Sequence, residues 1–129
     1  MLSGSAAGLA CEYSEQGTMP LHRAAKKAEL VPEVDEWSIK TRAGGALVQY
    51  VVLLDRPIRV AGRCYWTVEV SANGKLWQRF YVTPDGTGVR AELSDGRPAS
   101  VAEWRRARRR AAARPQAATP TPESTATGP

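Results

Sequence analysis

The stretch that decides the fold is residues 64–82, which read CYWTVEVSANGKLWQRFYV. β-branched and aromatic residues fill both halves of this stretch. Between them lies Asn73-Gly74, a residue pair that tight hairpin turns favour. The pattern predicts two antiparallel strands, Cys64–Val70 and Leu76–Val82, connected by a short turn.

Two further strands are expected to complete a sheet around this hairpin. The same period of two fills Leu47–Leu54, and Pro84-Asp85-Gly86 is a turn signal that leads into Val89–Leu93. Residues 55–63 contain Pro57 and form either a loop or a short extra strand. Short connections favour antiparallel pairing, so we predict a four-stranded antiparallel meander.

Alternation along the strands assigns side chains to two faces of the sheet. The face that helices are expected to cover is apolar except for Gln78, and it comprises Cys64, Trp66, Val68, Val70, Leu76, Phe80, Val82, Val89, Ala91 and Leu93. The opposite face mixes aromatic and charged groups, as a half-solvated sheet does, and it comprises Tyr65, Thr67, Glu69, Trp77, Arg79, Tyr81, Arg90 and Glu92.

Helices are predicted before and after the strands. Helical spacing of apolar residues runs from about Pro20 to Leu30, with Thr18 as the expected cap, and a second short segment covers 33–42. Ser100 and Glu103 form a capping-box pattern that begins a last helix at Val101, which extends to about Arg114. The predicted fold class is therefore α+β, with one or two N-terminal helices packed on the sheet.

The chain is expected to contain one folded domain. Residues 1–10 would be the remnant of a signal peptide or a disordered N-terminus, residues 11–98 the α+β domain, residues 99–114 a basic helix, and residues 115–129 a disordered tail rich in Pro, Thr and Ala. No stretch is apolar enough to predict a membrane span, and we expect a monomer.

The net charge of +5 is concentrated near the C-terminus. Residues 1–102 hold 12 Lys and Arg against 11 Asp and Glu, whereas residues 103–114 hold six Arg against one Glu. The helix arginines are Arg105, Arg106, Arg108, Arg109 and Arg110. They would attract an anionic partner, either nucleic-acid phosphates in the cytoplasm or lipid head groups and anionic polymers of the cell envelope. Alternatively, they reflect a coding bias that favours Arg over Lys.

The two cysteines link the fold to a cellular compartment. The first ten residues are small and uncharged and resemble the end of a signal peptide, although they would equally fit an unstructured N-terminus of a cytoplasmic protein. In an exported protein Cys11 and Cys64 would form a disulfide, whereas in the cytoplasm they would be two free thiols.

The sequence shows no signature of catalysis. The single histidine, His22, has no catalytic neighbours at a useful spacing, and one His with two distant Cys does not make a metal site, so we expect no metal and no cofactor. Tyr65, Trp77 and Tyr81, with Arg79 between them, would form a stacking or partner-binding platform. The alternative is that these aromatic side chains pack under the last helix together with Trp104.

Several motifs together carry a family resemblance: Cys11-Glu12-Tyr13, Met19-Pro20-Leu21, Arg63-Cys64-Tyr65-Trp66 and Leu76 to Pro84. On these motifs the chain, from residue 11 to about residue 86, resembles small exported proteobacterial proteins of unknown function. The resemblance implies export and implies no activity. Residues 99–129, with the arginine-rich helix, depart from that family's pattern.

These observations favour a non-enzymatic periplasmic or secreted module that binds a protein or an anionic envelope component. The alternative is a cytoplasmic nucleic-acid-binding protein that uses the arginine helix against phosphates and the three aromatic residues of the sheet face against bases. An enzyme whose pocket is assembled from scattered residues would leave no motif in a single sequence, so it remains a third hypothesis.

Overall fold

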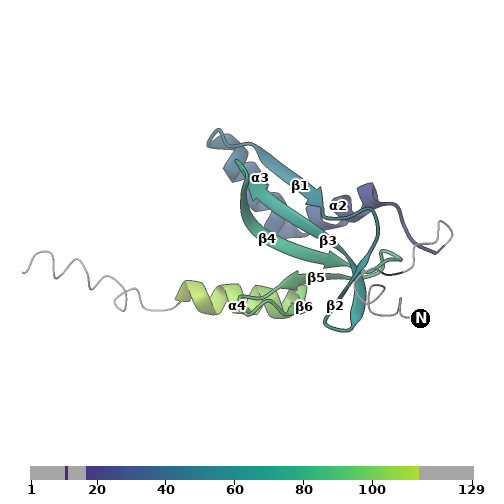
Figure 1. Cartoon of the computed structure of the whole chain (residues 1–129). Coiled ribbons are helices and arrows are strands. Elements are labelled where there is room, and N and C mark those ends of the chain that lie inside the picture. Colours follow the sequence, from purple (N-terminus) through teal and green to yellow (C-terminus); the bar gives the residue numbers. More distant parts are fainter. Residues whose placement is uncertain (1–10, 12–16, 114–129) are drawn as a thin grey trace, which may run out of the picture.

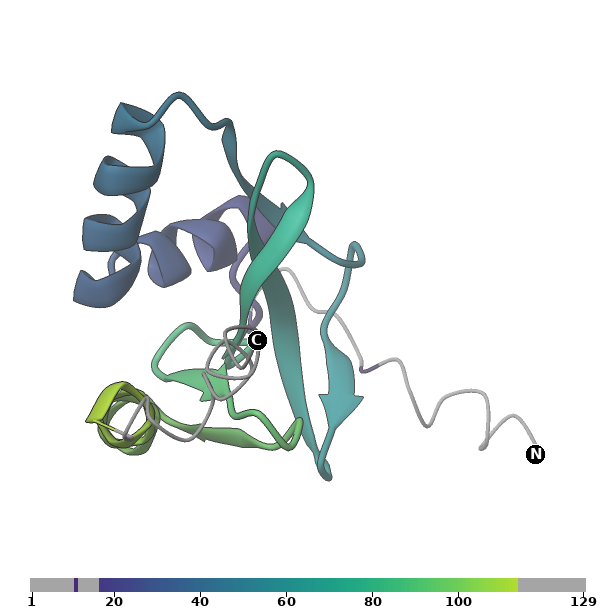
Figure 2. The ribbon, with the colours of Figure 1, turned by 90° about the vertical axis from the view of Figure 1, so that its left-hand side faces the viewer.

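A computed structural model describes residue 11 and residues 17–113, and it shows an α+β fold with its helices on one side of a twisted antiparallel sheet (Figures 1 and 2). The helices are α2 (Leu21–Glu29), α3 (Pro32–Ala43) and α4 (Val101–Ala113). The strands are β1 (Val48–Val52), β2 (Ile58–Val60), β3 (Arg63–Ala72), β4 (Lys75–Val82), β5 (Val89–Glu92) and β6 (Pro98–Ser100). No helix among these residues is long and apolar enough to cross a membrane.

The sheet confirms the predicted meander and adds two short strands to it. The strand order is β1-β3-β4-β5-β6, and β2 pairs with the first residues of β3. The prediction of four strands is therefore wrong in number, because β2 forms within residues 55–63 and β6 follows β5. Each of these strands has only three residues, too few to show a period, and β6 begins at Pro98.

The hairpin between β3 and β4 turns at the predicted residues. Asn73 and Gly74 both have a positive φ, 51° and 81°, as a tight turn between right-twisted strands requires. Asn73 also joins the turn to the strand beside it. Its side-chain Oδ1 accepts the N–H of Leu47 at 2.9 Å, and its own N–H donates to the carbonyl of Leu47 at 2.8 Å.

The N-terminal helices cover the apolar face. In α2 the buried residues are Ala24 and Ala28, whose small side chains let the helix approach the sheet closely. The prediction that Thr18 caps this helix is wrong, since Pro20 occupies the N-cap position and no side chain accepts a capping hydrogen bond. The core contains Ala24, Ala28, Val31, Val34, Trp66, Val68, Val70, Phe80, Val82, Ala91 and Trp104.

A bulge in β4 changes the faces of two residues. Val70 pairs with Gln78 but Ser71 pairs with Leu76, which leaves Trp77 as the extra residue. Beyond the bulge the alternation is reversed, so Leu76 is exposed and Trp77 packs against the core. The predictions that Leu76 lies on the covered face and Trp77 on the opposite face are both wrong for this reason.

Candidate functional site

The arginine helix α4 is built into the domain. The hydroxyl of Ser100 accepts the N–H of Glu103 at 3.0 Å, which confirms the predicted start of the helix. One turn later Trp104 is buried, with its ring edge-on to Phe80 at 5.4 Å between centroids. Its indole N–H donates to the side-chain oxygen of Gln78 at 3.2 Å. Gln78 is the polar exception on the covered face, and it is thus the sheet residue to which α4 is hydrogen-bonded.

An ion pair between α3 and α4 is the second attachment. Arg105 donates two hydrogen bonds to the carboxylate of Glu33, one of them from its Nη2 at 3.0 Å. The hydrogen bond from Arg105 holds the pKa of Glu33 below its ordinary value, against the opposing effect of burial. The two residues are 72 positions apart in the chain, so no local pattern would reveal the pair.

A layered aromatic cluster is the third attachment. Trp37 from α3 and Trp77 from β4 are stacked, with ring centroids 4.3 Å apart and planes inclined by 6°. The guanidinium of Arg108 lies over Trp77 at 5.6 Å and over Trp104 at 5.0 Å from the ring centroids. These are cation–π distances, and they join α3, the bulge of β4 and α4.

The five predicted arginines therefore divide into two groups. Arg105 and Arg108 hold the helix on the domain, as described above. Arg106, Arg109 and Arg110 are exposed, and no acidic side chain within residues 17–113 pairs with them. A rigidly held helix with three unpaired arginines on its outer side is an anion-attracting surface.

A cleft lies beside this helix. It has a volume of about 450 Å³, and it separates α4 from the turn between β5 and β6. Trp77, Trp104 and Arg108 line it together with Leu93 and Ala111. Gln78, Glu92 and Ser94 line it as well, so the cleft combines apolar walls with one guanidinium and one acidic residue.

On the opposite face of the sheet, a network of polar side chains joins β3, β4 and β5. Arg79 donates to Glu69 at 2.7 Å and to Glu92 at 2.9 Å, so its charge is fully used across three strands. The Tyr81 hydroxyl donates to Glu92 at 3.2 Å. Burial, followed by the nearby charge of Glu92, raises the pKa of Tyr81 to about 12.

The predicted aromatic platform is not assembled on this face. Tyr65 and Tyr81 do meet, with centroids 5.6 Å apart, but each is only 4% exposed. Trp77, the third member, lies on the helix side in the cluster with Trp37. The alternative prediction, packing with Trp104 beneath the last helix, describes Trp77 correctly.

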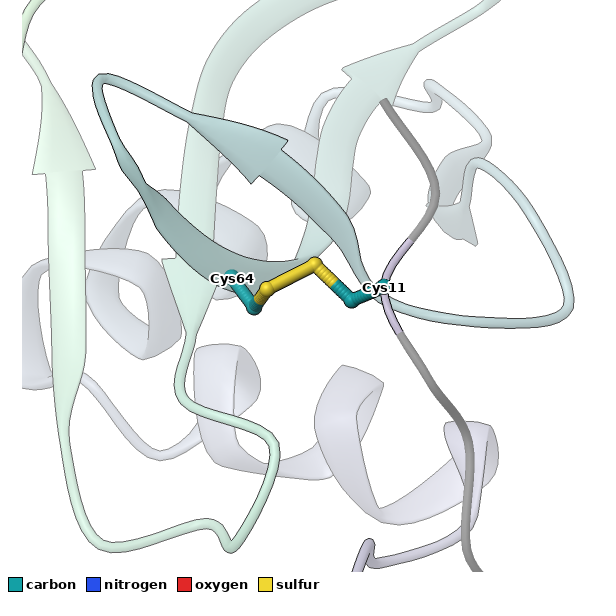
Figure 3. The surroundings of a disulfide bond; sticks show 2 residues. All are labelled: Cys11 and Cys64. Carbon is teal, nitrogen blue, oxygen red and sulfur yellow. A yellow bond between two sulfur atoms is a disulfide. The ribbon is translucent and has the colours of Figure 1, made fainter. Parts of the chain in front are cut away.

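The cysteine pair closes the edge of the sheet where β3 begins (Figure 3). Cys11 and Cys64 are joined by a disulfide that links positions 53 residues apart, with the Cα atoms separated by 6.1 Å. The N–H of Cys11 also donates to the carbonyl of Pro57 at 3.0 Å, just before β2. The predicted pairing is thus the pairing that the fold brings together.

Comparison with family models, with curated proteins and with solved structures finds no match to this chain. The site must therefore be interpreted from its own chemistry. His22 is exposed on α2. In the described part of the chain, no three His, Cys, Asp or Glu side chains gather as metal ligands would.

Sequence reasoning missed two residues of interest, Arg63 and Arg90. They line a second cavity, of about 340 Å³, beside Cys64. Arg63 is the first residue of β3, one position before the predicted strand, and Arg90 was predicted only as one charge among several on the outer face. Their meeting depends on strand order and register, and alternation within one strand does not report either.

Proposed function

We propose that the protein is a non-enzymatic, extracytoplasmic binding module that presents α4 to an anionic component of the cell envelope. The observation that carries the proposal is the division of the arginines in α4. Arg105 and Arg108 attach the helix to the body, and Arg106, Arg109 and Arg110 are left outward and unpaired within the described residues.

The clamped helix favours binding by electrostatic attraction of a preorganised surface. A helix that is already fixed loses little conformational entropy when a partner arrives, so the three outward charges contribute most of their attraction to affinity. The attraction should weaken steeply with added salt, because exposed charges are screened within about 10 Å at 0.1 M ionic strength.

The compartment is supported by the cysteine pair. A disulfide persists in the periplasm or outside the cell and is rare in the cytoplasm. The proposed location therefore depends on the Cys11–Cys64 bond being present in the cell. The non-enzymatic part of the proposal is supported only by the lack of a catalytic motif in the sequence.

Binding to anionic vesicles tests the role of α4. The probe is phosphatidylglycerol vesicles mixed with phosphatidylcholine, and the variant is R106Q/R109Q/R110Q. The matched control is R23Q/R42Q/K75Q, which removes the same charge from three exposed positions that pair with no acid in the described part of the chain. We expect the α4 variant to lose about tenfold or more in vesicle affinity and the control to lose less than about twofold. Equal losses would contradict the proposal.

Cell fractionation tests the compartment. The gene is expressed with its upstream sequence, and thiols are alkylated before lysis. We expect the protein in the periplasm or medium with no alkylatable thiol. A cytoplasmic protein with two free thiols and a preference for single-stranded DNA over vesicles would contradict the proposal and favour the nucleic-acid alternative. The buried positions of Tyr65 and Tyr81 argue against that alternative, because bases could not stack on them.

A further inference from the structure

We propose that the cavity beside Cys64 is a binding site for a phosphate-bearing ligand, with Arg63 and Arg90 as its recognition residues. The cavity lies where β3 begins and β5 begins, at the end of β6 that runs into α4. This site is separate from the outward arginines of α4 and does not rest on the function proposed for them.

The charges in this cavity are uncompensated. None of the described residues that line it is acidic, and neither the Arg63 nor the Arg90 side chain makes an ion pair or hydrogen bond with any residue in the described ranges. Arg90 is half-buried, and across the sheet it faces Tyr81 on one side and Ser100 on the other. A half-buried guanidinium without a carboxylate is costly unless an anion completes it.

The contrast with Arg79, one row away on the same face, shows what is missing. Arg79 is bonded to both Glu69 and Glu92. Glu92 lies two residues from Arg90 on the same strand, but its carboxylate is already taken by Arg79 and Tyr81. The sheet thus supplies acids for one arginine and none for the other.

The remaining lining groups suit an oxyanion. Tyr65 and Ser100 carry hydroxyls, whereas the Thr83 hydroxyl already donates to Asp85 at 2.8 Å. The 13-residue helix α4 begins directly after Ser100. The positive end of its dipole adds to the two guanidinium charges. The acid of its first turn, Glu103, is engaged by Arg97 at 3.6 Å.

The ligand class follows from these donors and from the volume. Guanidinium groups bind phosphate oxygens through paired, charge-assisted hydrogen bonds. A cavity of about 340 Å³ accommodates a phosphate with a small attached group. The disulfide at Cys64 fixes the strand next to Arg63, which preorganises the site.

Titration of the oxidised full chain with glycerol 1-phosphate, followed by ³¹P NMR and calorimetry, tests the site. We expect R63Q/R90Q to weaken binding about tenfold or more, and R23Q/R42Q to change it less than about twofold. The α4 variant R106Q/R109Q/R110Q should also bind normally, which separates this inference from the proposed function. No binding by the wild type, or equal losses in R63Q/R90Q and R23Q/R42Q, would overturn the inference.

Two additions complete the experiment. Because Arg90 is half-buried, R63Q alone, at an exposed position, is measured as well, and it should still lose several-fold in affinity. Unchanged affinity in R63Q would count against the site. Competition between glycerol 1-phosphate and phosphatidylglycerol vesicles then identifies the source of the phosphate. This competition is measured once binding to the site has been shown. Displacement of glycerol 1-phosphate by the vesicles indicates a lipid head group as the ligand, and no displacement indicates a free phosphate ester.

Discussion

The two faces of the sheet are held together by different forces. On the helix side, aromatic and aliphatic side chains form the core, and the exposed Arg108 lays its guanidinium over two tryptophan rings. On the outer side, a row of charges joins Glu69, Arg79 and Glu92. The disulfide adds a covalent link beside β2, the strand that lies away from the helices (Figure 2).

This difference indicates which charged groups of the molecule are available to bind a ligand. The helix side holds α4 through the apolar burial of Trp104, the stacked tryptophans under Arg108 and the Arg105–Glu33 ion pair. Added salt does not weaken the apolar part of this attachment, so α4 can stay in place while its outward arginines engage ions. The outer side pairs Arg79 with Glu69 and Glu92 and leaves the Arg63 and Arg90 side chains without an acidic partner among the described residues.

The largest effect is expected from the disulfide beside β2. The C11A/C64A variant, in which both cysteines are replaced, should be less stable than the oxidised wild type by about 4 kcal/mol. The reason is that the bond closes a loop of 53 residues in the unfolded chain. Thermal unfolding should show a drop of more than about 8 °C. Reduction of the wild type should produce a similar drop, and an unchanged melting temperature in both cases would contradict this role.

The bulge predicts opposite consequences for two neighbouring residues. W77A should cost about 2 kcal/mol, since it removes a half-buried ring stacked on Trp37 and covered by Arg108. L76A should cost about 0.5 kcal/mol, since Leu76 is 43% exposed. Urea unfolding of the two variants measures both values. A larger loss of stability for L76A than for W77A would mean that Leu76 is the buried residue, and it would contradict the bulge.

Alkaline pH should weaken the outer side selectively. Burial raises the pKa of Tyr81 from 10.0 to about 12, so its contribution is complete below pH 10 and is lost as pH rises towards 12. By pH 11 the loss should reach about 1.4 kcal/mol. Urea unfolding at pH 8 and pH 11 measures it, with Y81F as the control that lacks this component. If Y81F and the wild type lose equal stability, the buried phenol is not responsible.

A small gain is expected at Thr67. Its hydroxyl is buried on the outer side and has no hydrogen-bond partner among the described residues, so T67V should stabilise the protein by about 1 kcal/mol. T83V provides the contrast, because the Thr83 hydroxyl accepts the N–H of Gly88 at 2.9 Å and donates to Asp85 at 2.8 Å. Thermal unfolding should rise for T67V and fall for T83V. A fall for both would mean that the Thr67 hydroxyl is satisfied in solution.

The sequence alone predicted the features that depend on near neighbours. The hairpin at Asn73-Gly74 and the start of α4 after Ser100 follow from local backbone preferences. Residues 33–42 were predicted only as a short segment, either helical or irregular, and the structure shows that they are helical. The pairing of Cys11 with Cys64 followed from counting, since the chain has two cysteines. The α+β class followed from the change of period along the chain.

Only the tertiary structure decided which side chains meet. A single extra residue in β4 exchanged the faces of Leu76 and Trp77, and strict alternation gives no sign of such a bulge. The run of five arginines looks uniform in the sequence, yet Glu33, 72 residues away from Arg105, makes one of them structural. Arg63 and Arg90 share a cavity through strand order. The physical reason is the same in each case, because pairing across a sheet or between helices depends on contacts that local residue preferences do not encode.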